Sequence, residues 1–173
     1  MKKYNGFTLI ELMIVIVVIG ILASMMMIAS NESVSTAKAS NIVSNLRNFS
    51  MAAMALYTDK IDDYVSLPGS SPDPITDQVK LYLHNEGDIP DKDRYHVFRT
   101  KETKDGKDYQ VWWAGYVFEN NDTRVKEKLE DRANGANLKG TNGSNPPTDS
   151  TTASTFKSND NSVWLKIRSS GKR

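Results

Sequence analysis

The stretch that decides the fold is Gly6-Phe7-Thr8-Leu9-Ile10-Glu11-Leu12-Met13-Ile14-Val15-Ile16-Val17-Val18-Ile19-Gly20-Ile21-Leu22-Ala23, and its apolar character continues to Ala29. A helix over residues 7–29 has about 23 residues and a length of roughly 34 Å, enough to cross a bilayer. The basic residues Lys2 and Lys3 precede it and favour a cytoplasmic N-terminus. The sequence therefore predicts a membrane-spanning helix.

Three ordinary explanations compete for this stretch. A secretory signal has a shorter apolar region and a small-residue cleavage site, for which Leu22-Ala23-Ser24 is a weak candidate inside a run that continues past it. A buried core helix does not fit this hydrophobicity. A plain membrane anchor fits the length, but it has no use for the carboxylate of Glu11.

Glu11 is costly within an apolar segment unless it is paired or protonated. After Lys3 the segment offers no basic residue near it on the helix, so a partner has to come from elsewhere. Cleavage between Gly6 and Phe7 would create a new α-amine a little over one helical turn before Glu11. In a stack of such helices, the amine of one subunit could meet Glu11 of its neighbour.

Residues Gly6 to Leu12 and the long apolar run with Gly20 closely resemble the prepilin signature of type IV pilins, type II secretion pseudopilins and competence pilins. The resemblance implies cleavage after Gly6 by a prepilin peptidase, N-methylation of Phe7 and a role for Glu11 in subunit docking. It also implies related minor pilins, an inner-membrane assembly platform and a separate assembly ATPase as partners. Many family members have a proline where this chain has Ile28, so we expect an uninterrupted helix here.

The resemblance and the sequence pattern together predict an α+β, pilin-like fold, in which a long N-terminal helix packs on a small antiparallel sheet. We expect a leader at 1–6, an assembly helix at 7–29, its amphipathic continuation at 30–57 and a globular head at 58–173. No glycine or proline lies between Gly20 and Pro68. Steps of three and four predict a stripe that faces the core, formed by Ala39, Ile42, Leu46, Phe49, Ala53 and Leu56.

The head shows weaker patterns. Residues 59–74 resemble a loop and 74–86 a short helix with Pro74 near its start. Strands are predicted at 95–99, 109–118 and 162–168, with a hairpin turn at 104–107. We expect an exposed helix at 122–133, capped by Asp122 and ended near Gly135, and a mobile surface loop at 139–154. Trp112 and Trp113 should point to opposite faces of their strand.

The sequence lacks catalytic constellations, so no enzymatic activity, cofactor or small-molecule substrate is expected. The chain has no cysteine, and its two histidines, His84 and His96, do not have zinc-binding spacing. Two aspartate groups, one around Pro90 (Asp88, Asp91, Asp93) and one at Asp59, Asp62 and Asp63, are interpreted as solvated turns rather than calcium sites. With 22 basic and 21 acidic residues the chain is nearly neutral. The basic end (Lys166, Arg168, Lys172, Arg173) could touch DNA, but a solvated terminus is favoured.

The predicted function is structural. Subunits would wait in the cytoplasmic membrane with the head outside the cytoplasm and then enter a homo-oligomeric helical filament. The sequence does not separate an extracellular type IV pilus from a periplasmic type II secretion pseudopilus. The alternatives are a membrane-anchored extracytoplasmic binding domain and a DNA-uptake (competence) pilin.

Overall fold

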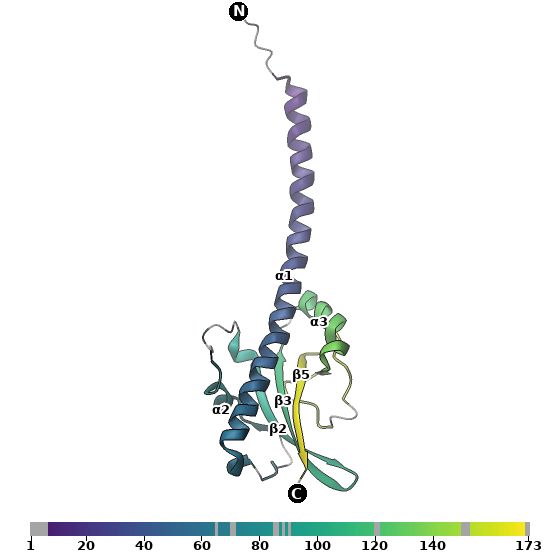
Figure 1. The fold of residues 1–173 in the computed structure, drawn as a ribbon. Helices are drawn as coiled ribbons and strands as arrows, with labels where there is room; N and C mark the ends of the chain where they lie inside the picture. Colours follow the sequence, from purple (N-terminus) through teal and green to yellow (C-terminus); the bar gives the residue numbers. More distant parts are fainter. Residues whose placement is uncertain are drawn as a thin grey trace, which may run out of the picture.

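The computed structural model has one long helix whose C-terminal half is packed into a small head (Figure 1). It describes residues 7–64, 66–69, 72–84, 87, 89, 91–119, 122–149 and 153–171. The elements, in chain order, are α1 (Leu9–Asp59), η1 (Ile61–Tyr64), β1 (Asp73–Pro74), α2 (Thr76–Lys80), η3 (Lys92–Arg94), β2 (Tyr95–Lys104), β3 (Lys107–Val117), α3 (Thr123–Ala136), β4 (Leu138–Thr141) and β5 (Ser162–Gly171).

Helix α1 is continuous over 51 residues. Its backbone passes through Ile28 without interruption, as expected from the missing proline. Within the head, one stripe of the helix is buried, and every predicted stripe residue from Ala39 to Leu56 is at most 6% exposed. The period-3.6 pattern therefore predicted correctly which face of α1 packs on the head.

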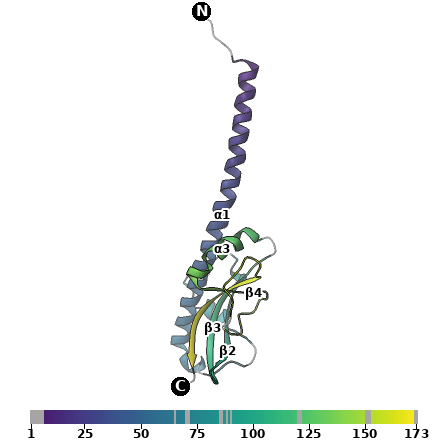
Figure 2. The same ribbon diagram turned by 90° about the vertical axis from the view of Figure 1, so that its right-hand side faces the viewer.

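The sheet is antiparallel and five-stranded, with the order β1-β2-β3-β5-β4. Helix α1 crosses one face of it, and α3 lies beside α1 at the end of the head nearer the N-terminus (Figures 1 and 2). The β2–β3 turn uses Asp105 at φ 52° and Gly106 at φ 70°. Positive φ at both central residues is the requirement of a tight hairpin turn that matches strand twist. The predicted α+β fold and its hairpin are thus confirmed.

The two faces of the sheet hold different clusters. Trp112 belongs to the core between sheet and α1, where Phe49 stacks on Tyr95 with ring centroids 5.2 Å apart. Trp113 points to the other face and packs with Val111 and Trp164. The opposite orientations predicted for the adjacent tryptophans are confirmed, and Trp113 is buried within the single chain.

Several predicted boundaries in the head are wrong. The segment 59–74 is not all loop, because it contains η1 and β1. Within the described part of the predicted helix at 74–86, which ends at His84, the α-helix covers only Thr76–Lys80. The reason is edge pairing: Pro74 pairs with Phe98, and the Ile75 amide donates to the Val97 carbonyl at 2.9 Å. A proline is tolerated on an edge strand, so the chain adds to the sheet before the helix can begin.

The predicted loop at 139–154 is also partly wrong. Residues Leu138–Thr141 form β4 and pair with β5, and both Pro146 and Pro147 are buried. The sequence Leu-Lys-Gly-Thr has no pattern that predicts a strand. Strand β4 therefore forms because it can pair with the edge of β5, not because its residues prefer strand conformation.

Helix α3 departs from its prediction in its N-terminal cap and on one face. Asp122 is at the N-cap position, but its side chain caps no helix amide. Its Oδ2 instead accepts from Arg94 at 3.0 Å and from the Glu119 amide at 3.1 Å. The helix ends at Ala136, next to the predicted Gly135, and its C-cap Asn137 adopts φ 53°. The helix is not simply exposed, because Val125, Leu129 and Ala133 are buried.

The far face of the sheet provides a stability prediction. A Cβ on Gly115 would lie 2.1 Å from the Trp164 ring, whereas a Cβ on Gly135 would meet no atom within 4 Å. In a fragment beginning at Asn31, we expect Gly115→Ala to lower the unfolding free energy by about 2–3 kcal/mol, because overpacking forces backbone or ring shifts. The matched control Gly135→Ala should raise it by roughly 0.5–1 kcal/mol, since alanine favours helix. Urea unfolding measures both, and equal midpoints would contradict the packing at Gly115.

Candidate assembly site at the N-terminal half of α1

The N-terminal half of α1 exposes an uninterrupted apolar surface. The large apolar side chains between Phe7 and Met27 are between 48% and 88% exposed in the single chain. Soluble monomers rarely show apolar patches of more than a few hundred Å². Helix α1 is long and apolar enough to cross a membrane, and no residue of its most apolar stretch is buried in the single chain. This surface requires a covering of lipid or of other helices.

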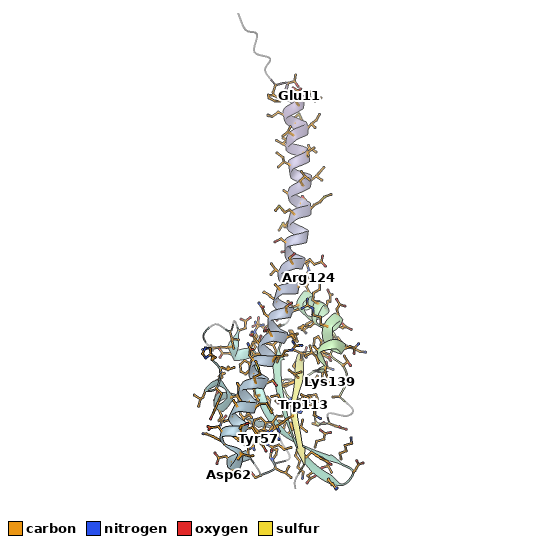
Figure 3. The ribbon with its side chains drawn as sticks, in the orientation of Figure 1. Glu11, Tyr57, Asp62, Trp113, Arg124 and Lys139 are labelled. Atoms are coloured by element: carbon orange, nitrogen blue, oxygen red, sulfur yellow. The ribbon has the colours of Figure 1, made fainter. Side chains whose placement is uncertain are left out.

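The two halves of α1 differ in how their apolar residues are distributed. In the first half they surround the helix, as Leu9, Ile10, Leu12 and Met13 are all more than half exposed. In the second half most of them form the buried stripe described above, while Val34, Met51 and Met54 stay exposed. A helix that is apolar all round is typical of a membrane span or of the centre of a bundle. Figure 3 shows this half projecting from the head with side chains on all sides.

Glu11 lies at the far tip of this projecting half (Figure 3). Thr8 is the N-cap of α1, and the two residues form a capping box. The Thr8 amide and hydroxyl both donate to Glu11 Oε2 at 2.8 Å, and the Glu11 amide donates to Thr8 Oγ1 at 3.3 Å. The carboxylate therefore satisfies otherwise unpaired donors at the start of the helix.

The capping box corrects one step of the sequence argument. Glu11 does have partners within its own chain, although they are neutral hydrogen-bond donors rather than a positive charge. The pattern Thr-x-x-Glu ahead of an apolar run is the sequence signal that could have revealed them. Both hydrogen bonds to the Glu11 carboxylate are accepted by Oε2, and Oε1 accepts none from the described residues. One carboxylate oxygen thus remains available to an outside cation.

The structure describes only some of the other residues predicted for processing. Phe7 is 88% exposed and directly precedes the N-cap. Gly6 and the rest of the leader at 1–6, including Lys2 and Lys3, are outside the described residues. Phe7 and Glu11 are therefore brought to one end of α1, and the predicted cleavage point immediately precedes them.

The remaining candidates do not converge on a site. His84 is exposed in a turn after α2 rather than on a helix, and His96 is half-buried on β2, where burial and the charge of Lys80 lower its pKa. Among the described residues no three histidine or acidic side chains gather as a metal site; Asp88 falls outside them. Arg168 stacks on Tyr57 at 3.7 Å from the ring centroid, and Lys172 and Arg173 are not among the described residues.

A polar network that the sequence did not reveal joins η3, β3 and the start of α3. Arg94 donates to Asp122 at 3.0 Å and to the Tyr116 hydroxyl at 3.1 Å, and it also pairs with Glu119. Despite partial desolvation, these bonds raise the pKa of Arg94, while burial raises the pKa of Tyr116. The network fixes the start of α3 on the sheet, and its partners are too distant in sequence for local patterns to indicate.

Comparison with known families gives one match. Residues 1–27 match the family model described as the prokaryotic N-terminal methylation motif, the signature of type IV pilins and pseudopilins. No curated protein and no solved structure matches the chain. The match covers the same segment as the exposed apolar half of α1. The chain thus carries the pilin-type methylation signature on a fold with a long apolar N-terminal helix and an antiparallel sheet.

Proposed function

We propose that this chain is a subunit of a helical filament, either a type IV pilus or a type II secretion pseudopilus. In this account a prepilin peptidase cuts after Gly6 and methylates the new amine of Phe7. The subunit waits in the cytoplasmic membrane with its head outside the cytoplasm. An inner-membrane assembly platform, driven by a separate ATPase, then moves it into a filament with copies of itself and related minor pilins.

The observation that carries this proposal is the coincidence of two features over one segment. Residues 1–27 match the methylation motif, and the described part of that segment is the half of α1 that the head leaves uncovered. Lipid can cover this surface before assembly, and neighbouring helices can cover it afterwards. We therefore assign residues 1–6 to the leader, 7–29 to membrane insertion and assembly, 30–57 to head packing and 58–173 to the globular head.

Glu11 is assigned to subunit docking. Its Oε2 is engaged by Thr8, and its Oε1 is available to the Phe7 amine of an adjacent subunit. Such an ion pair between chains would neutralise both charges inside an apolar core, where an unpaired charge is strongly unfavourable. The pair would also set the axial offset between neighbouring subunits.

A membrane-anchored binding domain is the second candidate. A hollow of about 520 Å³ lies between α1 and the segment after α2, with Met51, Ala52, Tyr82, Leu83 and His84 in its lining. Its size is within the range of small-molecule sites. An anchor of this kind has no need of Glu11, so tolerance of Glu11→Leu in every assay would favour this candidate over the filament subunit.

The proposal predicts how the chain behaves without its first half. Buried residues among the described ones begin at Ser35, so a fragment starting at Asn31 retains the core. We expect this fragment to be soluble and monomeric by sedimentation at concentrations where the mature chain, beginning at Phe7, associates. The physical reason is that the fragment lacks the large uncovered apolar surface. Filaments formed by the fragment alone would show that the assembly surface has been assigned to the wrong half.

A further inference from the structure

A charged hollow lies where α3 meets α1, at the end of the head nearest the apolar half of the helix. It has a volume of about 220 Å³ and is lined by Glu32 and Ser35 of α1 and by Arg124, Glu127 and Lys128 of α3. Lys128 Nζ lies 2.8 Å from Glu32 Oε1. Figure 3 places Arg124 at this end of the head, beside α1.

The position of this hollow relative to the membrane follows from the length of the apolar run. Glu32 comes three residues after Ala29, about 4.5 Å further along the helix axis. Headgroups occupy roughly 5–7 Å beyond each side of the hydrocarbon core. When residues 7–29 span the bilayer, as the proposed function requires, the hollow therefore lies within the headgroup layer of the extracytoplasmic leaflet.

The charges of the hollow are balanced. It contains two carboxylates and two cations, and the hydrogen bond and charge of Lys128 lower the pKa of Glu32, which keeps this carboxylate ionised. Glu32 and Lys128 thus largely neutralise each other. Arg124 and Glu127 form no ion pair within the part of the chain that the structure describes. They present one positive and one negative group to the same space.

We propose that this hollow binds a phospholipid headgroup that carries both a phosphate and a primary ammonium group, as phosphatidylethanolamine does. The guanidinium of Arg124 suits a phosphate, to which it can donate two parallel hydrogen bonds. The carboxylate of Glu127 accepts from a primary ammonium, whereas the quaternary ammonium of phosphatidylcholine has no hydrogen to donate. A purely anionic headgroup would satisfy Arg124 but would leave the carboxylate of Glu127 without a cationic partner. The bound headgroup would hold the head against the membrane before assembly.

The test uses the full mature chain in nanodiscs of phosphatidylcholine with a minor fraction of either phosphatidylethanolamine or phosphatidylglycerol. Native mass spectrometry counts the lipids retained on the protein. Because the chain lacks cysteine, a fluorophore on Thr123→Cys can report contact with lipids that carry a quencher on the headgroup. The variants are Arg124→Gln and Glu127→Gln, and the matched control is Arg47→Gln, an exposed arginine about 22 Å further along α1.

We expect phosphatidylethanolamine to be retained at least about threefold over the other two lipids, with each hollow variant removing the preference and Arg47→Gln preserving it. Equal retention of all three lipids, a preference for phosphatidylglycerol, or hollow variants that match the wild type would overturn the inference. Failure of the wild-type chain to resist carbonate extraction from vesicles would instead refute the membrane-inserted precursor itself.

Discussion

Replacing Glu11 by leucine is expected to lower filament yield by at least about tenfold, because the Phe7 amine of the neighbouring subunit would remain buried without a counter-charge. Removing the carboxylate also removes its own cost in the membrane, so synthesis, insertion and cleavage should continue. Glu11→Asp should give an intermediate yield, since its shorter side chain reaches less far. Filaments are sheared from the cells and quantified beside the protein in the membrane fraction. The comparison separates a loss of assembly from a loss of synthesis, insertion or cleavage.

The capping box makes a sharper version of this experiment possible. Glu11 has two separable roles, because it bonds Thr8 within the chain and offers a charge outside it. Glutamine at this position can keep the capping box but carries no charge. We therefore expect Glu11→Gln to fail like Glu11→Leu, and Thr8→Val, which loses the cap but keeps the charge, to retain most of the yield. Normal filaments from Glu11→Gln would show that capping, not pairing, is what Glu11 contributes.

Replacing Gly6 by valine is expected to leave nearly all of the protein as uncut precursor in the membrane. The proposed cleavage point follows Gly6, and a branched side chain there would crowd the backbone that the peptidase has to approach. Immunoblots that separate precursor from mature protein measure the change. Gly20→Ala is the matched control, because a Cβ at Gly20 meets no atom within 4 Å, and it should be processed normally. Cleavage of Gly6→Val at the wild-type rate would refute the assigned processing site.

The long-range plan of the molecule could be predicted because it depends on periodic signals. The spacing of three and four residues that places Leu46 and Phe49 in the core continues over several turns of α1, and both residues are buried. The Asp105-Gly106 pair similarly predicts its own turn, since few residues accept positive φ. Such features are decided by neighbours in sequence.

The errors arose where tertiary contacts overrode local preference. Pro74 and Ile75 pair with β2 rather than opening a helix, and Asp122 bonds Arg94 rather than the first turn of α3. Both partners are more than 20 residues away in sequence, so no local pattern could indicate them. The Thr8–Glu11 capping box is different, because its signal is local and visible in the sequence.

The most direct test of the account is the identity of the N-terminus in assembled material. Filaments sheared from cells that express this chain should contain it, and mass spectrometry of the N-terminal peptide should show N-methylated Phe7 as the first residue. Recovery of the chain only from the membrane fraction, with Met1 to Gly6 still attached in cells that have an active prepilin peptidase, would contradict the account.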